Sequence, residues 1–465
     1  MPRRAPIQTT EFADPVTLRV VDIGVDGKAV AQADSGKTVF VDGGLPGETI
    51  SARIFARSKR YDRAKLVSIV APSVDRVAAA CAHFGVCGGC AWQDLSYDAQ
   101  LRLKKKQTID ALARLGGFND VTVDNPIGSS DRFYYRNKME FSFHRDSEDP
   151  SAVLSLGLHS RERFDSVFDV TDCRLESPRV NPILAWLREY ATAQSLPAYD
   201  KRLHVGFLRF VVIREGKNTG ESMVHLVTTS GEFPDARRLS EEFARAFPEV
   251  TTLTRSVTDT RANVAYGELA DIFFGPGFIR ERILDHTFRV YPNSFFQTNT
   301  TQTERLYTLI QNYASLAPHE RVLDLYCGAG TITLTLAPQC MEIIGVESEP
   351  VAIRGAIENA ADSRVANARF IAGDVRATLR ERKSEFHATN VIITDPPRAG
   401  MSPRAIYHMT DLGATRIVYV SCNPGAFARD AASIRERGYA LRQVTPVDMF
   451  PHTPHIELVT LFVRN

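Results

Sequence analysis

From about Ser294 to its end, the chain alternates short apolar runs with stretches long enough to form helices. This alternation predicts successive βαβ units with right-handed crossovers, and therefore a doubly wound parallel sheet of the α/β class. Ligands of such a sheet bind at the carboxyl ends of its strands, so the residues after each run are the first candidates for a site. The runs are Val322–Leu325, Glu342–Val346, Arg369–Ala372, Val391–Thr394 and Arg416–Val420.

The segment from about Val16 to Ala71 has a different pattern, in which five short runs alternate with glycine-rich turns. Five strands in so short a segment predict a small closed barrel of the oligonucleotide-binding kind. Its last part is basic, which is typical both of a surface that follows a phosphate backbone and of an ordinary solvated edge strand. The basic residues are Arg53, Arg57, Lys59, Arg60, Arg63 and Lys65, with Tyr61 among them.

The part between, from about Pro72 to Pro292, mixes strand-like runs with helices and predicts an α+β arrangement. A basic helix is expected over Tyr97–Leu115, because Gly116 and Gly117 then end it. Within this helix, Lys104–Lys106 are expected to form a solvated face.

Composition limits the partners of the chain. Its 465 residues include 56 Lys and Arg against 55 Asp and Glu, so the net charge is +1, and any polyanion must be held by local patches. No apolar run approaches the roughly 18 residues that span a bilayer, and the first residues show no secretory leader. Seven cysteines, an odd number in a long chain, favour a reducing compartment. We expect a cytoplasmic protein with no membrane partner.

Four cysteines of the central part form one candidate metal site. Three of them follow one another as C-x5-C-x2-C, and the fourth is the only other cysteine in this part of the chain. Four thiolates suit either zinc, for which His83 is a substitute ligand, or an iron–sulfur cluster. The spacing differs from that of radical S-adenosylmethionine enzymes, which disfavours radical chemistry. The candidate ligands are Cys81, Cys87, Cys90 and Cys173.

The first run of the alternating segment leads into a loop with Gly328 and Gly330, where the backbone can turn tightly and approach a ligand. Glu347 ends the next run and is placed to accept both hydroxyls of a ribose. Asp374 follows the third run, where an adenine amino group could donate. The third glycine of a dinucleotide fingerprint is replaced by Ile332–Thr333. The pattern favours S-adenosylmethionine over a dinucleotide, which is the alternative.

Reactive side chains follow the later strands. Asp395-Pro-Pro-Arg398 comes after the fourth run, Cys422 after the fifth, and Glu457 lies on the last strand. Such a set suits methylation at C5 of uracil, a carbon without a lone pair. A thiolate adds to C6, C5 then accepts the methyl group, and a base removes the C5 proton so that the thiolate leaves. By itself, a cysteine on a strand is more often a small buried hydrophobe, and we expect that of Cys327 and Cys340.

A Ser-Phe-Phe-Gln motif precedes the alternating segment. Phe295 or Phe296 could stack on a base while the planar amide of Gln297 bonds its edge. The alternative is a pair of core aromatics followed by a helix cap.

Taken together, these motifs resemble the RNA 5-methyluridine methyltransferases, and among them the branch that acts on 23S ribosomal RNA. The resemblance covers nearly the whole chain and includes a barrel like the TRAM domain, the cysteine spacing, Ser-Phe-Phe-Gln and the glycine loop. Asp-Pro-Pro-Arg, Ser-Cys-Asn-Pro and Pro-His-Thr-x-His-x-Glu, in this order, are its most specific parts. Two departures, Gly425-Ala-Phe and Ile456, stand where many relatives have Ala-Thr-Leu and Val.

The resemblance implies three domains: a TRAM barrel (16–71), a central RNA-binding domain (72–96 and 120–292) and a Rossmann-like class I methyltransferase domain (97–119 and 293–465). It implies Cys422 as the nucleophile and Glu457 as the base. A [4Fe–4S] cluster is implied on Cys81, Cys87, Cys90 and Cys173. S-adenosyl-L-methionine is implied at Gln297, Tyr326, Thr331, Glu347, Asp374 and Asp395.

The partner implied is RNA, 23S ribosomal RNA first, and the protein is expected to act as a monomer without an obligate protein partner. The transfer-RNA branch lacks the barrel and the cluster cysteines, so their presence favours ribosomal RNA. The alternatives are the same chemistry on transfer RNA, an amino-group RNA methyltransferase that uses Asp395-Pro-Pro-Arg398, a non-catalytic iron–sulfur RNA-binding protein and a ferredoxin-like redox protein.

Overall fold

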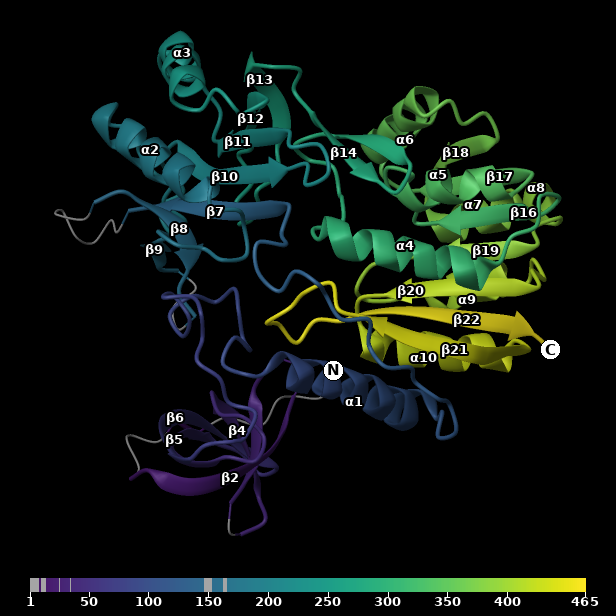
Figure 1. Ribbon diagram of the computed structural model, residues 1–465, viewed down its shortest axis with the longest axis horizontal. Helices are drawn as coiled ribbons and strands as arrows, with labels where there is room; N and C mark the ends of the chain where they lie inside the picture. Colours follow the sequence, from purple (N-terminus) through teal and green to yellow (C-terminus); the bar gives the residue numbers. More distant parts are fainter. Residues whose placement is uncertain (1–7, 10–13, 25, 34, 146–152, 162–164) are drawn as a thin grey trace.

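The computed structural model describes residues 8–9, 14–24, 26–33, 35–145, 153–161 and 165–465. The start of the chain, where the sequence predicts no leader, lies largely outside the described residues. The described strands form an N-terminal barrel, a central sheet with a small hairpin beside it, and a C-terminal sheet (Figure 1). Within these ranges, no helix is both long and apolar enough to cross a bilayer.

The N-terminal segment forms the expected five-stranded barrel. Each strand pairs with the next around the ring, and β5 closes it by pairing with both β2 and β6, while β1 (Gln8–Thr9) adds to β5. Alternate residues point inward, as the period of two along a strand requires, and fill the barrel with aliphatic side chains. The ring strands are β2 (Val16–Ile23), β3 (Ala29–Gln32), β4 (Thr38–Asp42), β5 (Thr49–Arg57) and β6 (Tyr61–Ala71).

The central part is a seven-stranded sheet in the order β13-β12-β11-β10-β7-β8-β9, with two helices, α2 and α3, beside it (Figure 1). Strands β10 and β11 are buried along their whole length, because the sheet is covered where they lie. The elements are β7 (Lys138–His144), β8 (Ser155–His159), β9 (Val167–Asp169), α2 (Val180–Ala193), β10 (Leu208–Glu215), β11 (Ser222–Thr228), α3 (Ala236–Ala246), β12 (Thr252–Val257), β13 (Glu268–Phe274) and the hairpin β14 (Ile279–Ile283) and β15 (His286–Val290).

The C-terminal part is an α/β sheet of seven strands in the order β18-β17-β16-β19-β20-β22-β21. One core packs α1, α7, α9 and α10 on the sheet, and another packs α4, α5 and the β14–β15 hairpin on it. The elements are α4 (Thr300–Ala314), β16 (Arg321–Leu325), α5 (Thr331–Leu336), η1 (Ala337–Gln339), β17 (Glu342–Glu347), α6 (Pro350–Asp362), β18 (Ala368–Ala372), α7 (Val375–Glu381), α8 (Lys383–Phe386), β19 (Val391–Thr394), α9 (Pro403–Thr410), β20 (Arg416–Ser421), α10 (Pro424–Glu436), β21 (Tyr439–Val447) and β22 (Glu457–Arg464).

The last strand, β22, departs from the all-parallel sheet that the sequence predicts. It is antiparallel both to β20 and to β21, so β21, which follows the helix α10, still runs in the direction of β20. The β21–β22 hairpin needs no crossover helix, so the alternating pattern on which the prediction depends ends at β21.

The basic helix α1 (Tyr97–Gly116) lies against the C-terminal part (Figure 1). It ends at Gly117, whose φ of 65° is a left-handed cap, as the two glycines predict. The guanidinium of Arg435 on α10 donates to the carbonyls of Gly116 and Gly117. The prediction of a solvated lysine face is wrong for Lys104, which is fully buried. Its ammonium group pairs with Asp448 on the connection between β21 and β22.

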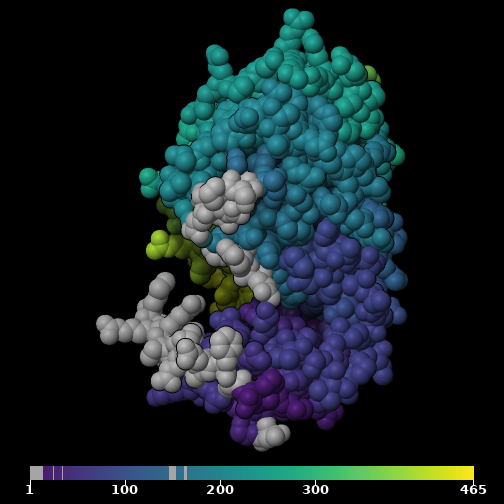
Figure 2. Space-filling model, turned by 90° about the vertical axis from the view of Figure 1, so that its left-hand side faces the viewer, coloured from purple at the N-terminus to yellow at the C-terminus, as the bar shows by residue number. Residues whose placement is uncertain are grey.

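The carboxyl ends of the parallel strands face the central sheet and the barrel. In Figure 1 the arrow of β22 points away from the central sheet, and β20 runs the opposite way. Figure 2 looks onto this side and shows the yellow-green C-terminal surface set back between the teal central part above and the purple barrel below.

Candidate functional site

Three loops meet at one edge of the C-terminal sheet. Strands β16, β19 and β20 are parallel neighbours, so the residues that follow them lie side by side. The amide of Asp395, directly after β19, donates to the carbonyl of Leu325 at the end of β16, at 3.3 Å. Cys422 follows β20 in the same way. The edge therefore carries the glycine loop, the aspartate and the thiol that the sequence singles out.

The glycine loop turns sharply after β16. Gly328 and Gly330 have φ values of 54° and 77°, which L-residues with side chains rarely adopt. A Cβ on Gly330 would lie 2.9 Å from the ring of Phe370, whereas one on Gly328 would meet nothing within 4 Å. The amide of Gly328 donates to Glu347 Oε2 at 3.2 Å. The loop is thus packed on one side and open on the other, with Glu347 held beside it.

Three other predicted cofactor residues, Tyr326, Asp374 and Thr331, follow strands of the same sheet or begin the helix after the glycine loop. Burial, followed by the charges of Asp374, Asp430 and Glu347, raises the pKa of Tyr326 to about 12. Asp374 also caps α7 by accepting from the amide of Ala377 at 2.9 Å. Thr331 begins α5, and its hydroxyl bonds that of a tyrosine on α4 at 2.6 Å.

Gln297 lies on the turn before α4 and is held through its backbone, since its carbonyl accepts from Asn137 at 2.9 Å. Among the described residues, no hydrogen bond or ion pair joins its side chain to the other predicted cofactor residues. Of the neighbouring aromatics, Phe296 is buried in the core, as the alternative interpretation predicts, whereas Phe295 is 72% exposed and its stacking on a base stays a prediction. The helix cap is Asn299, which accepts from the amide of Gln302.

The thiol of Cys422 lies on a turn that leads into α10. Asn423 caps the helix by accepting from the amide of Gly425 at 3.0 Å. Its amide nitrogen also donates to the carbonyl of Arg398 at 2.9 Å, which ties this turn to the loop after β19. The sequence analysis did not assign Asn423 this role, although an Asn before a Pro at the first helical position is a recognisable cap signal.

A thiol, two carboxyl groups and a guanidinium act on one another at this edge. Burial first, and then Glu457 and Asp395, raise the pKa of Cys422 to about 11 against the opposing effect of Arg398. Burial raises the pKa of Asp395 to about 6. Glu457, 5% exposed, has a pKa raised by burial and by Asp395 and lowered by Arg398. A carboxyl group with a raised pKa can take up and release a proton near neutral pH.

A buried aspartate, which the sequence analysis missed, holds the loop after β19. Asp430 on α10 accepts from the hydroxyl of Tyr419 at 2.6 Å and from the amide of Met401 at 2.7 Å. A Cβ on Gly400 would lie 2.6 Å from the same carboxyl group, and Gly400 has a φ of 82°. The sequence does contain a signal for this role, because Asp430 is a single acidic residue among the apolar residues of α10.

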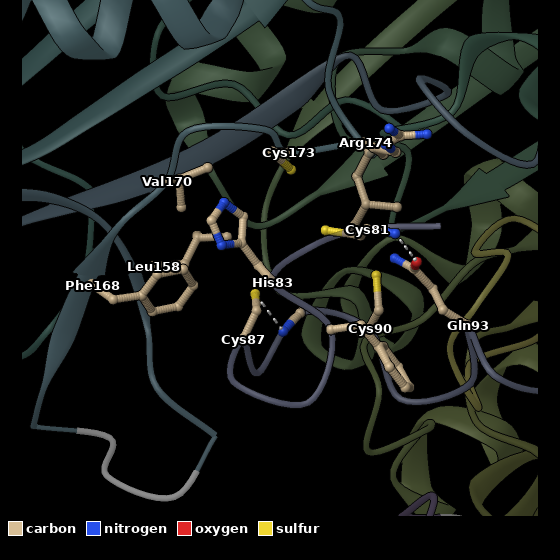
Figure 3. A pocket seen from close by; sticks show the side chains of 13 residues that line it. Cys81, His83, Cys87, Cys90, Gln93, Leu158, Phe168, Val170, Cys173 and Arg174 are labelled. Atoms are coloured by element: carbon tan, nitrogen blue, oxygen red, sulfur yellow. Dashed lines mark hydrogen bonds between the residues drawn. The ribbon is translucent and has the colours of Figure 1, made fainter. Parts of the chain in front are cut away.

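The four cluster cysteines line one pocket, and Figure 3 shows their sulfur atoms around a common space. Cys81, Cys87 and Cys90 come from the segment before α1, and Cys173 comes from the segment after β9. Burial first, and then the neighbouring thiols, raise the pKa of Cys90 to about 12. Among the described residues, no three or more His, Cys, Asp or Glu side chains are arranged to hold a metal ion.

His83 also lines this pocket. Its Nε2 accepts from the backbone amides of Thr171 and Asp172 at 3.2 and 3.3 Å. That nitrogen is therefore already engaged, which argues against the histidine as a ligand through it.

Residues 96–465 match the family described as tRNA (uracil-5-)-methyltransferase. The chain belongs to this family. It is 39% identical to an uncharacterized RNA methyltransferase of Chlorobaculum tepidum, over 97% of this chain and 96% of that protein. It is 37% identical to another of Halalkalibacterium halodurans, over 96% of each.

A solved structure agrees with this membership. The tRNA (uracil-54, C5)-methyltransferase of Pyrococcus abyssi, in complex with S-adenosyl-L-homocysteine, is 30% identical, with a TM-score of 0.78 over 96% of this chain and all of that one. This chain is accordingly an S-adenosylmethionine-dependent RNA (uracil-C5)-methyltransferase.

Proposed function

We propose that this methyltransferase modifies a uridine through Cys422 as nucleophile and Glu457 as base. The observation that carries the proposal is the meeting of Cys422, Glu457 and Asp395 at the sheet edge that also carries the glycine loop. A carbon without a lone pair needs this combination of a thiol with an acid–base group.

S-adenosylmethionine supplies the methyl group. Cys422 gives up its proton to solvent water and its sulfur bonds C6 of uracil, while the C5–C6 π electrons shift toward C5 and the C4 oxygen, which makes C5 electron-rich. After C5 has accepted the methyl group, Glu457 takes the C5 proton, the C–H electrons form the C5–C6 double bond, and the S–C6 bond breaks. Asp395 and Arg398 would orient the ring, the first by accepting from its imide N–H and the second by donating to a carbonyl oxygen.

The methyl donor would bind over the glycine loop. The amide of Gly328 and the carboxylate of Glu347 already contact each other, and the open side of Gly328 leaves room for a ligand. We assign the ribose hydroxyls to Glu347 and the adenine amino group to Asp374, whose free carboxylate oxygen can accept while the other caps α7. The proposed cofactor residues are Gln297, Tyr326, Thr331, Glu347, Asp374 and Asp395.

We further propose a [4Fe–4S] cluster on Cys81, Cys87, Cys90 and Cys173. Four thiols line one pocket, and burial raises the pKa of Cys90 there, so a metal centre would have to bind the thiols for them to ionise. The choice of the cluster over zinc rests on the resemblance to the branch that has this cysteine spacing. When bound, it would cross-link the segment before α1 to the segment after β9.

The barrel (16–71) and the central part (72–96 and 120–292) would grip RNA around the site, and the protein would act as a monomer. The target uridine would leave its stack to reach Cys422, because the reacting carbons are covered in a helix. The basic strand edge of the barrel would contact phosphates.

We propose 23S ribosomal RNA as the substrate, supported by the cysteine pocket and by the resemblance to that branch. Transfer RNA is the second candidate, since the Pyrococcus abyssi enzyme acts on uracil 54 of tRNA. That enzyme matches 96% of this chain, barrel included, so the barrel is no sign of a ribosomal substrate.

One experiment tests the chemistry and another the substrate. RNA with 5-fluorouridine should trap the protein covalently through Cys422, because fluorine at C5 cannot leave as a proton; an amino-group methyltransferase would give no adduct. Methylated uridines should then be mapped in ribosomal and transfer RNA from a strain without this gene. Loss of a 5-methyluridine only from tRNA would overturn the ribosomal assignment.

A further inference from the structure

The catalytic base proposed above begins β22, directly after the connection from β21. Val447 ends β21 and pairs with Glu457 in the register of the hairpin. Residues 448–456, here called the base loop, therefore leave and re-enter the sheet beside the base. The conformation of this loop determines where the Glu457 carboxyl group lies relative to the thiol.

The base loop is held from outside the hairpin. Its consecutive carbonyls from Asp448 to His452 each accept a hydrogen bond from another segment. The donors come from α4 and its cap, from α1, from the residues before β7 and from the residues directly after Cys90. They are Gln302 to Asp448 O at 3.0 Å, Asn299 to Met449 O at 3.1 Å, Lys104 to Phe450 O at 3.1 Å, Tyr135 to Pro451 O at 3.1 Å, and the Ala91 and Trp92 amides to His452 O at 3.0 Å.

The base loop also contains one residue with a strained backbone. His452 has a φ of 65°, which costs a residue with a Cβ free energy and persists only where the surroundings impose it. The backbone amide of His452 donates to Gln100 Oε1 on α1 at 2.8 Å. Helix α1 thus holds the loop at both an amide and a carbonyl.

The first residue of the base loop forms a fully buried ion pair with α1. Lys104 Nζ lies 2.5 Å from Asp448 Oδ1, and both side chains are 0% exposed. The hydroxyl of Tyr97 donates to Asp448 Oδ2 at 2.8 Å, and the amide of Phe450 donates to Oδ1 at 3.2 Å. A buried pair held by several further hydrogen bonds tolerates few alternative geometries, because a shift leaves a charge without a partner.

We propose that Lys104 is a positioning residue for the reaction, which fixes Glu457 through Asp448 and the base loop. The inference rests on the proposed role of Glu457 as base. It predicts a specific defect, because Glu457 acts only in the last step. If its carboxyl group is displaced, Cys422 still adds to C6 and C5 still accepts the methyl group. The C5 proton then stays, the S–C6 bond does not break, and methylated RNA remains attached to the protein.

The test compares Lys104→Met with a double variant, Lys104→Met/Asp448→Asn, which leaves no buried charge uncompensated. Lys106→Met is the matched control, since Lys106 is also on α1 and also paired with aspartates, Asp22 and Asp110, but is exposed. Each protein is incubated with ordinary substrate RNA and methyl-labelled S-adenosylmethionine. Covalent RNA–protein complex is measured on denaturing gels, together with released methylated RNA.

We expect turnover to fall by about tenfold or more in both Lys104 variants, while the labelled covalent fraction rises severalfold. The control should stay within about twofold of the parent in both measurements. A lysine with only a structural role would lower the covalent fraction and the turnover together.

A double variant that melts like the parent and forms no extra covalent complex would overturn the inference. Glu457→Gln is run beside it to separate the two proposals. If Glu457→Gln traps methylated RNA and the Lys104 variants do not, only the positioning role fails. If Glu457→Gln turns over normally, the base assignment itself fails and the inference falls with it.

Discussion

The cysteine pocket and the strand-end site both bury thiols, but they surround them differently. In the pocket, burial raises the pKa of Cys90 to about 12, and other thiols are its ionisable neighbours. At the strand ends, burial raises the pKa of Cys422 to about 11, and its neighbours are two carboxyl groups and a guanidinium. Thiols among thiols ionise when a metal centre binds them. A thiol among acids and an arginine can exchange its proton with them, which is what a nucleophile requires.

The largest effect is expected where the thiol reacts. Cys422→Ala should lower methyl transfer by about 10⁴-fold or more, because no other group can make C5 electron-rich. Iron content should not change. Transfer of labelled methyl groups to RNA, with iron analysis of the same preparation, measures both. Full methylation by Cys422→Ala would contradict the comparison between the two regions.

A substitution in the cysteine pocket should remove the metal, which a substitution of Cys422 should leave in place. Cys90→Ser should lose iron and acid-labile sulfide and lower the free energy of unfolding by about 4 kcal/mol, because a hydroxyl is a poor substitute for a thiolate ligand. Metal analysis and chemical denaturation are the measurements, with Cys422→Ala as the control that keeps its metal. Stoichiometric zinc in the parent protein would refute the cluster, and full iron in Cys90→Ser would refute Cys90 as one of its ligands.

The pH dependence of thiol alkylation separates Cys422 from an ordinary cysteine. With a pKa of about 11 in place of 9, its thiolate fraction at pH 8 is about 100-fold lower, and higher intrinsic nucleophilicity regains roughly tenfold. Alkylation by iodoacetamide should therefore be about tenfold slower than for an ordinary thiol, and its rate should rise until about pH 11. The Cys422 peptide is followed by mass spectrometry.

The substitution Asp395→Asn tests whether the charge of Asp395 raises the pKa of Cys422. At pH 8 an acid with a pKa of about 6 is ionised, so its charge opposes the thiolate. The substitution should lower the pKa of Cys422 and speed its alkylation at pH 8. An unchanged rate would show that the two side chains do not interact.

The smallest effect is expected at Cys340. Burial raises its pKa to about 11 as well, but it lies after η1, and its thiol donates to the carbonyl of Ala337. Cys340→Ala should keep turnover within about twofold and cost about 1 kcal/mol of stability, the price of a small cavity. Thermal melting and a methylation assay measure this. A large loss of activity would mean that a raised thiol pKa, rather than its neighbours, marks function here.

Much of the site follows from local sequence. The apolar runs place Asp395 and Cys422 after parallel strands, and such ends necessarily share an edge. Gly328 and Gly330 identify the loop, since only glycine adopts their backbone angles without strain. The family and its reaction are confirmed. The roles of the individual site residues and the cluster on the four cysteines stay predictions.

Only the tertiary structure decided how these parts are held. Lys104 looks like a solvated lysine in its helix, and it is buried because Asp448, 344 residues away, meets it. The same holds for Asp430 beneath Met401 and for the antiparallel β22, which breaks the parallel pattern. Periodicity and turn chemistry are properties of neighbouring residues and can be recognised in a sequence. Whether a charge is buried, or a hydrogen bond forms with a segment distant in sequence, depends on which segment packs there, and that follows from the folding of the whole chain.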